Sequence, residues 1–92
     1  METLFEWDDV KEAANLSKHG VSFDEAKTVF EDPLYVDFYD PDHSLREHRH
    51  IVVGESYRGR LLMVSYLERH GTIRIMSSRD LTSAERRDYE EG

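Results

Sequence analysis

Cysteine is absent from this chain of 92 residues, which excludes a disulfide framework and a thiolate metal site. No apolar run approaches the roughly 18 residues that a membrane-spanning helix needs, so we predict that no segment crosses a membrane. The first ten residues, METLFEWDDV, lack the basic and apolar regions of a secretory signal. These absences predict a cytoplasmic protein with one domain over residues 1–92 and a single modest core.

Lysine is missing from the second half of the chain and arginine from the first. Residues 1–45 carry twelve Asp and Glu against three Lys, whereas residues 46–92 carry eight Asp and Glu against nine Arg. The net charge of −8 argues against nucleic-acid binding by the whole surface, because phosphate contacts dominate that affinity. The arginine-only second half could still supply a local cationic face.

The segment Lys18–Ala26 predicts two helices joined by a very short turn. Gly20 can take the left-handed conformation that ends a helix. Ser22 opens the next helix as its N-cap, and Glu25 stands three residues later, where it would complete a capping box. Asp8 or Asp9 would cap the first helix, with Val10, Ala13, Ala14 and optionally Ser17 on its inner face.

The remaining pattern predicts an α+β domain with an antiparallel sheet and the order β-α-α-β-β-β-β-α. Phe23, Ala26, Val29 and Phe30 form a helical stripe that ends at Asp32-Pro33. In the last strand, Arg74 and Arg79 fall on opposite faces by parity unless a bulge intervenes. The expected strands are 4–7, 34–39, 48–55, 60–67 and 72–79. The first two helices are expected to end at about residues 19 and 31. A third helix is expected to begin at Thr82 with a second capping box.

Several motifs together resemble the BrnT family. The opening motif consists of Phe5, Trp7, Asp8, Lys11, Asn15, Lys18, His19, Gly20, Val21, Phe23 and Ala26. The later residues of the resemblance are Asp32, Pro33, Arg74, Ile75, Ser77, Arg79, Thr82, Glu85, Arg86 and Tyr89. The resemblance implies a ribonuclease toxin of a type II toxin–antitoxin pair with a RelE-like fold. It also implies a partner similar to BrnA, a ribbon-helix-helix antitoxin that neutralises the toxin and through which the pair would bind operator DNA.

Metal-free RNA cleavage needs a base, an acid and cations around the phosphate, with the 2′-hydroxyl as nucleophile. We predict His19, Arg49 and Arg79 as catalytic residues that share one cleft. The competing interpretations are a His19 that only caps its helix and an Arg79 held in an ion pair by Asp80 or Glu85. The expected substrate-binding residues are Lys18, Arg46, Glu47, His48 and Arg74.

We expect neither a metal nor a cofactor. The strand 48–55 alternates, with His48, His50, Val52 and Gly54 on one face and Arg49, Ile51, Val53 and Glu55 on the other. His48 and His50 thus share a face and His43 precedes them, but a metal site would need further converging ligands. A second hypothesis is that the chain binds its partner and takes part in autoregulation without useful cleavage. The acidity of the chain favours this second hypothesis, whereas the intact opening and closing motifs favour the nuclease.

Overall fold

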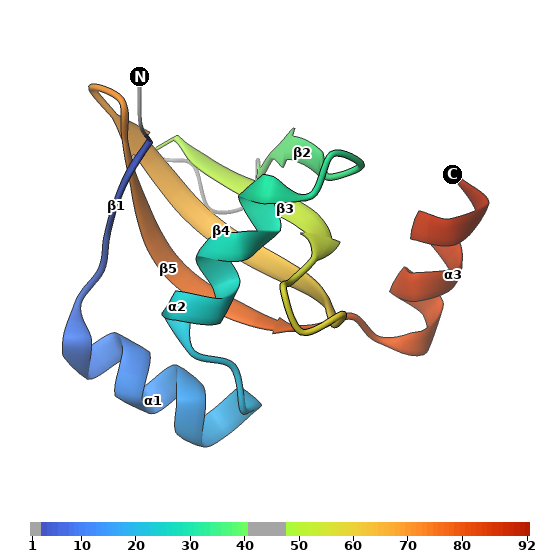
Figure 1. Ribbon diagram of the computed structural model, residues 1–92, viewed down its shortest axis with the longest axis horizontal. Coiled ribbons are helices and arrows are strands. Elements are labelled where there is room, and N and C mark those ends of the chain that lie inside the picture. The colour runs from blue at the N-terminus through green and yellow to red at the C-terminus, as the bar shows by residue number, and fades with distance from the viewer. Residues whose placement is uncertain (1–2, 41–47) are drawn as a thin grey trace.

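The computed structural model describes residues 3–40 and 48–92. Its elements follow the predicted order, which confirms a single α+β domain (Figure 1). None of the helices in this described part has the length and apolarity that crossing a membrane requires. The elements are β1 (Leu4–Glu6), α1 (Asp9–His19), α2 (Phe23–Ala26), the 3-10 helix η1 (Lys27–Glu31), β2 (Val36–Tyr39), β3 (Arg49–Glu55), β4 (Leu61–Arg69), β5 (Thr72–Asp80) and α3 (Ser83–Glu91).

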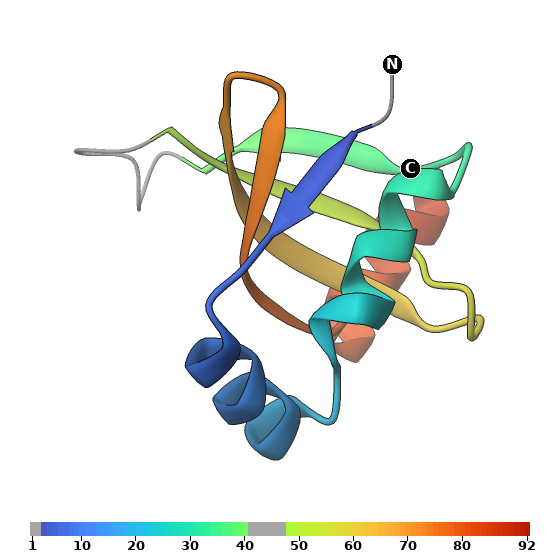
Figure 2. The same ribbon diagram turned by 60° about the vertical axis from the view of Figure 1, so that its left-hand side comes forward.

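The five strands form one sheet in the order β1-β5-β4-β3-β2. Strands β2 to β5 pair antiparallel as predicted, whereas β1 adds to the edge of β5 in parallel. Figure 2 shows α2 and η1 lying across one face of the sheet. Helix α3 extends away from the rest of the domain (Figure 1) and has no buried residue.

The core lies between the sheet and the segment that contains α2 and η1. The predicted helical stripe is confirmed, since Phe23, Ala26 and Val29 are fully buried and Phe30 packs against them half-buried. The alternation predicted for β3 is also confirmed, because His50 and Val52 pair with the core-side residues Tyr66 and Val64. The sheet side chains in this core are Val52, Leu62, Val64, Tyr66, Ile73 and Ile75.

The inner face predicted for α1 is wrong. Val10, Ala13 and Ala14 are exposed, and the buried residue of the helix is Asn15. Strand β1 pairs with residues 72–74 of β5, so no strand of the described residues pairs with the edge of β5 near Ser78. The Asn15 amide takes that place: its Nδ2 donates to the Ser78 carbonyl at 2.9 Å, and the Ser78 N–H donates to its Oδ1 at 3.1 Å. Helix α1 therefore docks on backbone polar groups, and apolar periodicity could not reveal this.

The turn between α1 and α2 forms largely as predicted. Gly20 ends α1 with φ at 69°, and the Ser22 hydroxyl accepts the Glu25 N–H at 3.0 Å. The second bond of that capping box, from the Ser22 N–H to the Glu25 carboxylate, does not form. The Glu25 carboxylate instead turns inward and binds Arg60 and Ser56. The second capping box, between Thr82 and Glu85, has both of its bonds.

The second helix changes character before its predicted end at Glu31. It is α-helical over Phe23–Ala26 and continues as the 3-10 helix η1. The Thr28 hydroxyl donates to the Glu25 carbonyl at 2.7 Å and accepts the Tyr57 N–H at 2.9 Å. This side-chain bonding competes with the α-helical ladder and ties the segment to the turn after β3.

A β-bulge changes the parity of the last strand. Ser65 of β4 pairs with Ser77, whereas the next residue, Tyr66, pairs with Ile75, so β5 contains one extra residue. Its core-facing residues are consequently Ile73, Ile75 and Ser78. Arg74 and Arg79 therefore lie on the same face of the sheet, away from the core.

Replacement of Gly20 tests the helix end. A Cβ at this position would meet no heavy atom within 4 Å, so the cost of Gly20→Val is conformational. We expect a loss of about 1–2 kcal/mol, seen as a fall in melting temperature of about 4–8 °C per kcal/mol. Gly20→Asn is the control and should lose less, because Asn tolerates the left-handed region. A Val variant that melts with the parent would contradict this account.

Asn15→Asp tests the docking of α1. The carboxylate would face the carbonyl oxygens of Val21 and Ser78, to which the amide now donates at 2.9 Å each. We expect a loss of at least about 2 kcal/mol at pH 7 by urea unfolding, since buried acceptors lose their donors. The exposed Ser17→Asp on the same helix adds the same charge and should cost far less. Equal losses for the two variants would mean that helix charge, not the bond to β5, is responsible.

Candidate functional site

The face of the sheet opposite the core carries most of the candidate arginines, and we call it the open face. Strand β3 contributes Arg49, Ile51 and Val53 to it, because these residues alternate with the core-side His50 and Val52. Helix α3 stands over one end of this face. It leaves an apolar groove of about 450 Å³ lined mainly by Val36, Phe38, Val53, Met63, Leu81 and Tyr89.

Three arginines converge at the other end of the open face, and we call them the arginine cluster. Leu67 of β4 pairs with Arg49 on one side and with Arg74 on the other. Residues paired in this way have Cβ atoms about 4.5–5.5 Å apart, so the two arginines flank Leu67. Arg69 follows two residues along β4 and points to the same side. The cluster therefore joins three adjacent strands.

A small hollow lies beside Arg69 and Arg74 of the cluster. It has a volume of about 190 Å³ and is lined by Glu6, Leu67, Arg69, Thr72, Arg74 and Met76. The Nη1 of Arg74 lies 3.5 Å from the Glu6 carboxylate, and the Arg74 side chain is 39% exposed. An ion pair at this length and exposure is weak, so an anion that enters the hollow can compete for the guanidinium.

Arg79 has a different environment at the far end of the same face. Its two terminal nitrogens donate to the two oxygens of Glu85 at 2.7 and 3.0 Å. Arg79 pairs with Met63, four residues before Leu67 on β4, or roughly 13 Å from the cluster by strand rise. The bidentate bond raises the pKa of Arg79 and, with the Thr82 N–H, lowers the pKa of Glu85 to about 2. Arg79 thus fastens α3 to the sheet, which is the ion pair considered as the competing interpretation.

Lys18 and His19 lie in the last turn of α1. Lys18 is exposed and His19 is half-buried. The turn that follows is held by Arg60, whose Nη2 donates to the Gly20 carbonyl at 3.0 Å. Because Arg60 immediately precedes β4 and Arg49 pairs near its end, His19 and Arg49 belong to opposite ends of the sheet. Among the described residues, the structure does not bring His19, Arg49 and Arg79 into one cleft.

Of the remaining predicted substrate-binding residues, His48 directly precedes β3. His48 is exposed, and its ring centroid lies 5.9 Å from that of Tyr39. Arg46, Glu47 and His43 lie outside the described residues. Within residues 3–40 and 48–92, no three His, Asp or Glu side chains are arranged to hold a metal ion.

Arg69 was missed from the sequence because the predicted strand ended too early. The residues Glu68 to Gly71 read as a turn, but β4 continues through Arg69 and only His70 and Gly71 turn the chain. Extending the alternation by two residues from Leu67 would have placed Arg69 on the same face of the strand as Leu67. The signal was therefore present in the strand period and was hidden by an uncertain boundary.

Fold and site together define a small α+β domain with one helix-covered face and one open face that carries arginines. The chain matches the family model described as "Ribonuclease toxin, BrnT, of type II toxin-antitoxin system" over residues 7–85. The protein therefore belongs to the BrnT family of ribonuclease toxins.

A solved structure is similar in fold. It is the 1.1 Å crystal structure of the Brucella abortus ribonuclease toxin BrnT, which is 19% identical in sequence with a TM-score of 0.64. The match covers 88% of this chain and 100% of that chain. No curated protein matches the sequence. The structural likeness supports the α+β fold, and the family match carries the function.

Glu85→Gln tests the fastening of α3. The folded state holds the pKa of Glu85 near 2, below its ordinary 4.5, so the stabilisation is complete above about pH 4.5 and is lost as pH falls toward 2. Both side chains are about one third exposed, at 37% and 33%, so we expect a loss of at most about 1 kcal/mol at pH 7. Urea unfolding at pH 7 and near pH 3 measures it, with the exposed Glu91→Gln as control. A loss that is the same at both pH values would contradict the assignment.

Proposed function

We propose that the protein is a metal-independent endoribonuclease whose arginine cluster holds the scissile phosphate. The observation that supports this proposal is the convergence of Arg49, Arg69 and Arg74 on three adjacent strands, with Arg69 and Arg74 lining one hollow. Arginine suits this role because its planar guanidinium binds phosphate oxygens in pairs and keeps its charge at any physiological pH.

The reaction would need no group outside the chain and its RNA substrate. A base removes the proton of the 2′-hydroxyl, the oxygen attacks the neighbouring phosphorus, and an acid protonates the leaving 5′-oxygen. Glu47 stands two residues before Arg49 in the chain, and we propose it for proton transfer at the cluster. Arg46 would add a further cation from the same segment. The crowded phosphate gains negative charge in the transition state, which is where fixed cations contribute most.

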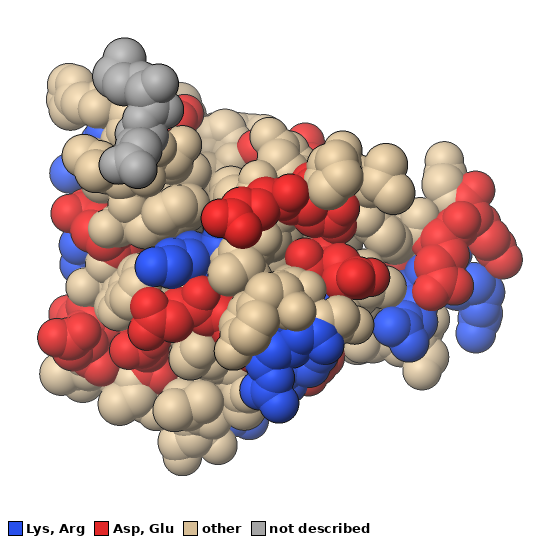
Figure 3. Space-filling view, in the orientation of Figure 1, with Lys and Arg blue, Asp and Glu red and all other residues tan. Residues whose placement is uncertain are grey.

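The acidity of the chain restricts where RNA can bind. Acidic side chains are spread over the face that carries α1 and α2, and cations occupy isolated places there (Figure 3). RNA would therefore approach the open face. Its affinity should fall as the salt concentration rises, and the slope should be small because the cluster provides only a few phosphate contacts. The second candidate, a partner-binding domain with little cleavage, is favoured by the net charge of −8.

The antitoxin that we propose as partner is a basic ribbon-helix-helix protein similar to BrnA. Membership of a type II toxin–antitoxin family supports an antitoxin partner in general. An acidic toxin gains little affinity for DNA phosphates by itself, so the pair would bind operator DNA through the antitoxin.

Single alanine variants of Arg49, Arg69 and Arg74 test the proposal. Each should lower the rate of RNA cleavage by about 10²-fold, as when other preorganised electrostatic groups are removed. Their melting temperatures should stay near that of the parent, because none of the three side chains is buried. Arg87→Ala on exposed α3 is the matched control and should keep the parent rate. Parent rates for all three cluster variants would refute the site, and a parent protein that cleaves no RNA would favour the partner-binding hypothesis.

The variants His19→Ala and Arg79→Ala are measured in the same assay, because the sequence predicts both residues as catalytic. We expect His19→Ala to keep most of its activity and Arg79→Ala to lose stability through α3. A rate loss in either variant without loss of stability would move the site to the other end of the sheet.

A further inference from the structure

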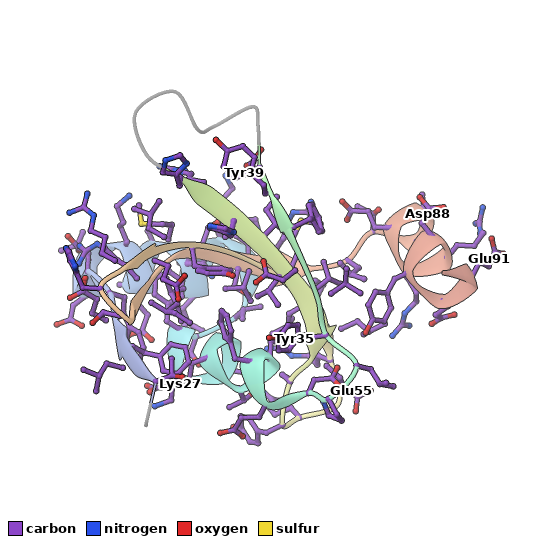
Figure 4. All side chains as sticks on the ribbon, turned by 90° about the horizontal axis from the view of Figure 1, so that it is seen from above. Lys27, Tyr35, Tyr39, Glu55, Asp88 and Glu91 are labelled. Carbon is purple, nitrogen blue, oxygen red and sulfur yellow. The ribbon has the colours of Figure 1, made fainter. Side chains whose placement is uncertain are left out.

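A third cavity lies on the helix-covered side of the sheet, on the opposite face from the arginine cluster. It has a volume of about 450 Å³ and opens between η1 and the edge strand β2. Tyr35, which stands just before β2 (Figure 4), forms part of its wall. We call it the aromatic–acidic pocket, and its principal residues are Phe30, Tyr35, Asp37, His50, Tyr66 and Glu68.

The aromatic side chains that line the pocket pack against one another. The rings of Phe30 and Tyr66 meet edge to face with centroids 5.0 Å apart, and His50 stacks on Tyr66 at 5.3 Å. Tyr35 extends the wall from Phe30, at 6.4 Å. Tyr66 is only 4% exposed, whereas Tyr35 is 44% exposed. The pocket thus has a fixed floor and an accessible rim.

Its two carboxylates form no ion pair with Lys or Arg in the described part of the chain. Asp37 accepts a hydrogen bond from the Tyr66 hydroxyl, and its other oxygen lies 3.9 Å from Nδ1 of His50. Elsewhere the carboxylates of Glu6, Glu25 and Glu85 each have an arginine. Burial raises the pKa of Tyr66, and the nearby charges of Asp37 and Glu68 raise it further, as expected where negative charge is not neutralised.

We propose that the aromatic–acidic pocket binds the guanidinium group of an arginine side chain presented by a protein partner. A guanidinium stacks on aromatic faces and pairs with carboxylates, and it is easier to dehydrate than an ammonium. Phosphate-bearing RNA is disfavoured here by Asp37 and Glu68. In the described part of the chain β2 is the last strand on its side of the sheet, so the partner chain could also pair with its outer edge beside the pocket.

This inference deepens the proposed function, since it rests on that function for the partner, the antitoxin. A toxin with a net charge of −8 and a basic partner attract each other over long range, but such steering fixes no orientation. A pocket that takes one arginine supplies the orientation. Arginines in enclosed pockets are common among the residues that dominate an interface.

The test uses two small probes that differ in charge and hardly in shape. N-acetyl-arginine amide and N-acetyl-citrulline amide are titrated separately into the isotope-labelled full chain and followed by NMR. We expect the arginine probe to shift the resonances of Asp37, His50, Tyr66 and Glu68, with a Kd on the order of 10 mM. The citrulline probe should leave these resonances in place.

Three variants of the chain complete the experiment. Glu68→Gln removes an exposed carboxylate and should weaken the arginine probe roughly fivefold or more, a typical effect for a charge-assisted contact. Glu91→Gln makes the same charge change on distant α3 and should bind like the parent. Asp37→Asn should also weaken binding, and because it removes a partner of Tyr66 it is read together with Glu68→Gln.

Three outcomes would overturn the inference. The citrulline probe could shift the same resonances as strongly, the arginine probe could shift only residues outside the pocket, or Glu91→Gln could weaken binding as much as Glu68→Gln. Shifts of these resonances by guanosine monophosphate, with none by the arginine probe, would instead assign the pocket to a nucleobase. RNA cleavage is measured separately, so failure here leaves the arginine cluster standing, and failure of the cluster leaves this result standing.

Discussion

The fold depends on one buried carboxylate. Glu25 is only 3% exposed, and it accepts hydrogen bonds from the guanidinium of Arg60 and, at 2.7 Å, from the Ser56 hydroxyl. Arg60 also donates to the Gly20 carbonyl, so a single ion pair joins α2, the turn between β3 and β4, and the end of α1. A buried charge without these partners would cost several kcal/mol. The hydrogen bonds to Arg60 lower the pKa of Glu25, and the helix layer is thereby fixed on one face of the sheet.

That arrangement explains why net charge describes this protein poorly. Arg60 is used in the network around Glu25, and Arg79 is used to hold Glu85 of α3. The arginines of the open face come from β3, β4 and β5 and are neighbours only because these strands pair. Composition could show that arginine is confined to the second half of the chain, but it could not separate those that bind carboxylates from those that gather on one face.

The sequence predicted best where a local rule decides the structure. The helix end at Gly20, the caps at Ser22 and Thr82, and the alternation of β3 each depend on a few adjacent residues, and each is confirmed. The sequence-based prediction failed where contacts with a segment far away in the sequence determine the structure. Asn15 packs inward because β5 has an open edge, and Arg79 shares a face with Arg74 because a bulge inserts one residue. Neither Ser78 nor Ser65 could be linked to these positions without the register of the sheet.

The register of β3 connects the two proposed sites. Arg49 and His50 are consecutive, yet one belongs to the arginine cluster and the other to the aromatic–acidic pocket, so a slip by one residue would exchange them. Gly54 prevents such a slip, because a Cβ there would meet Val29 at 3.0 Å and Tyr35 at 3.2 Å. The neighbouring Glu55 N–H donates to Asp32 at 2.8 Å, which binds the end of η1 to the same place. A side chain at position 54 would therefore push η1 away or shift β3, and either movement would disturb both faces at once.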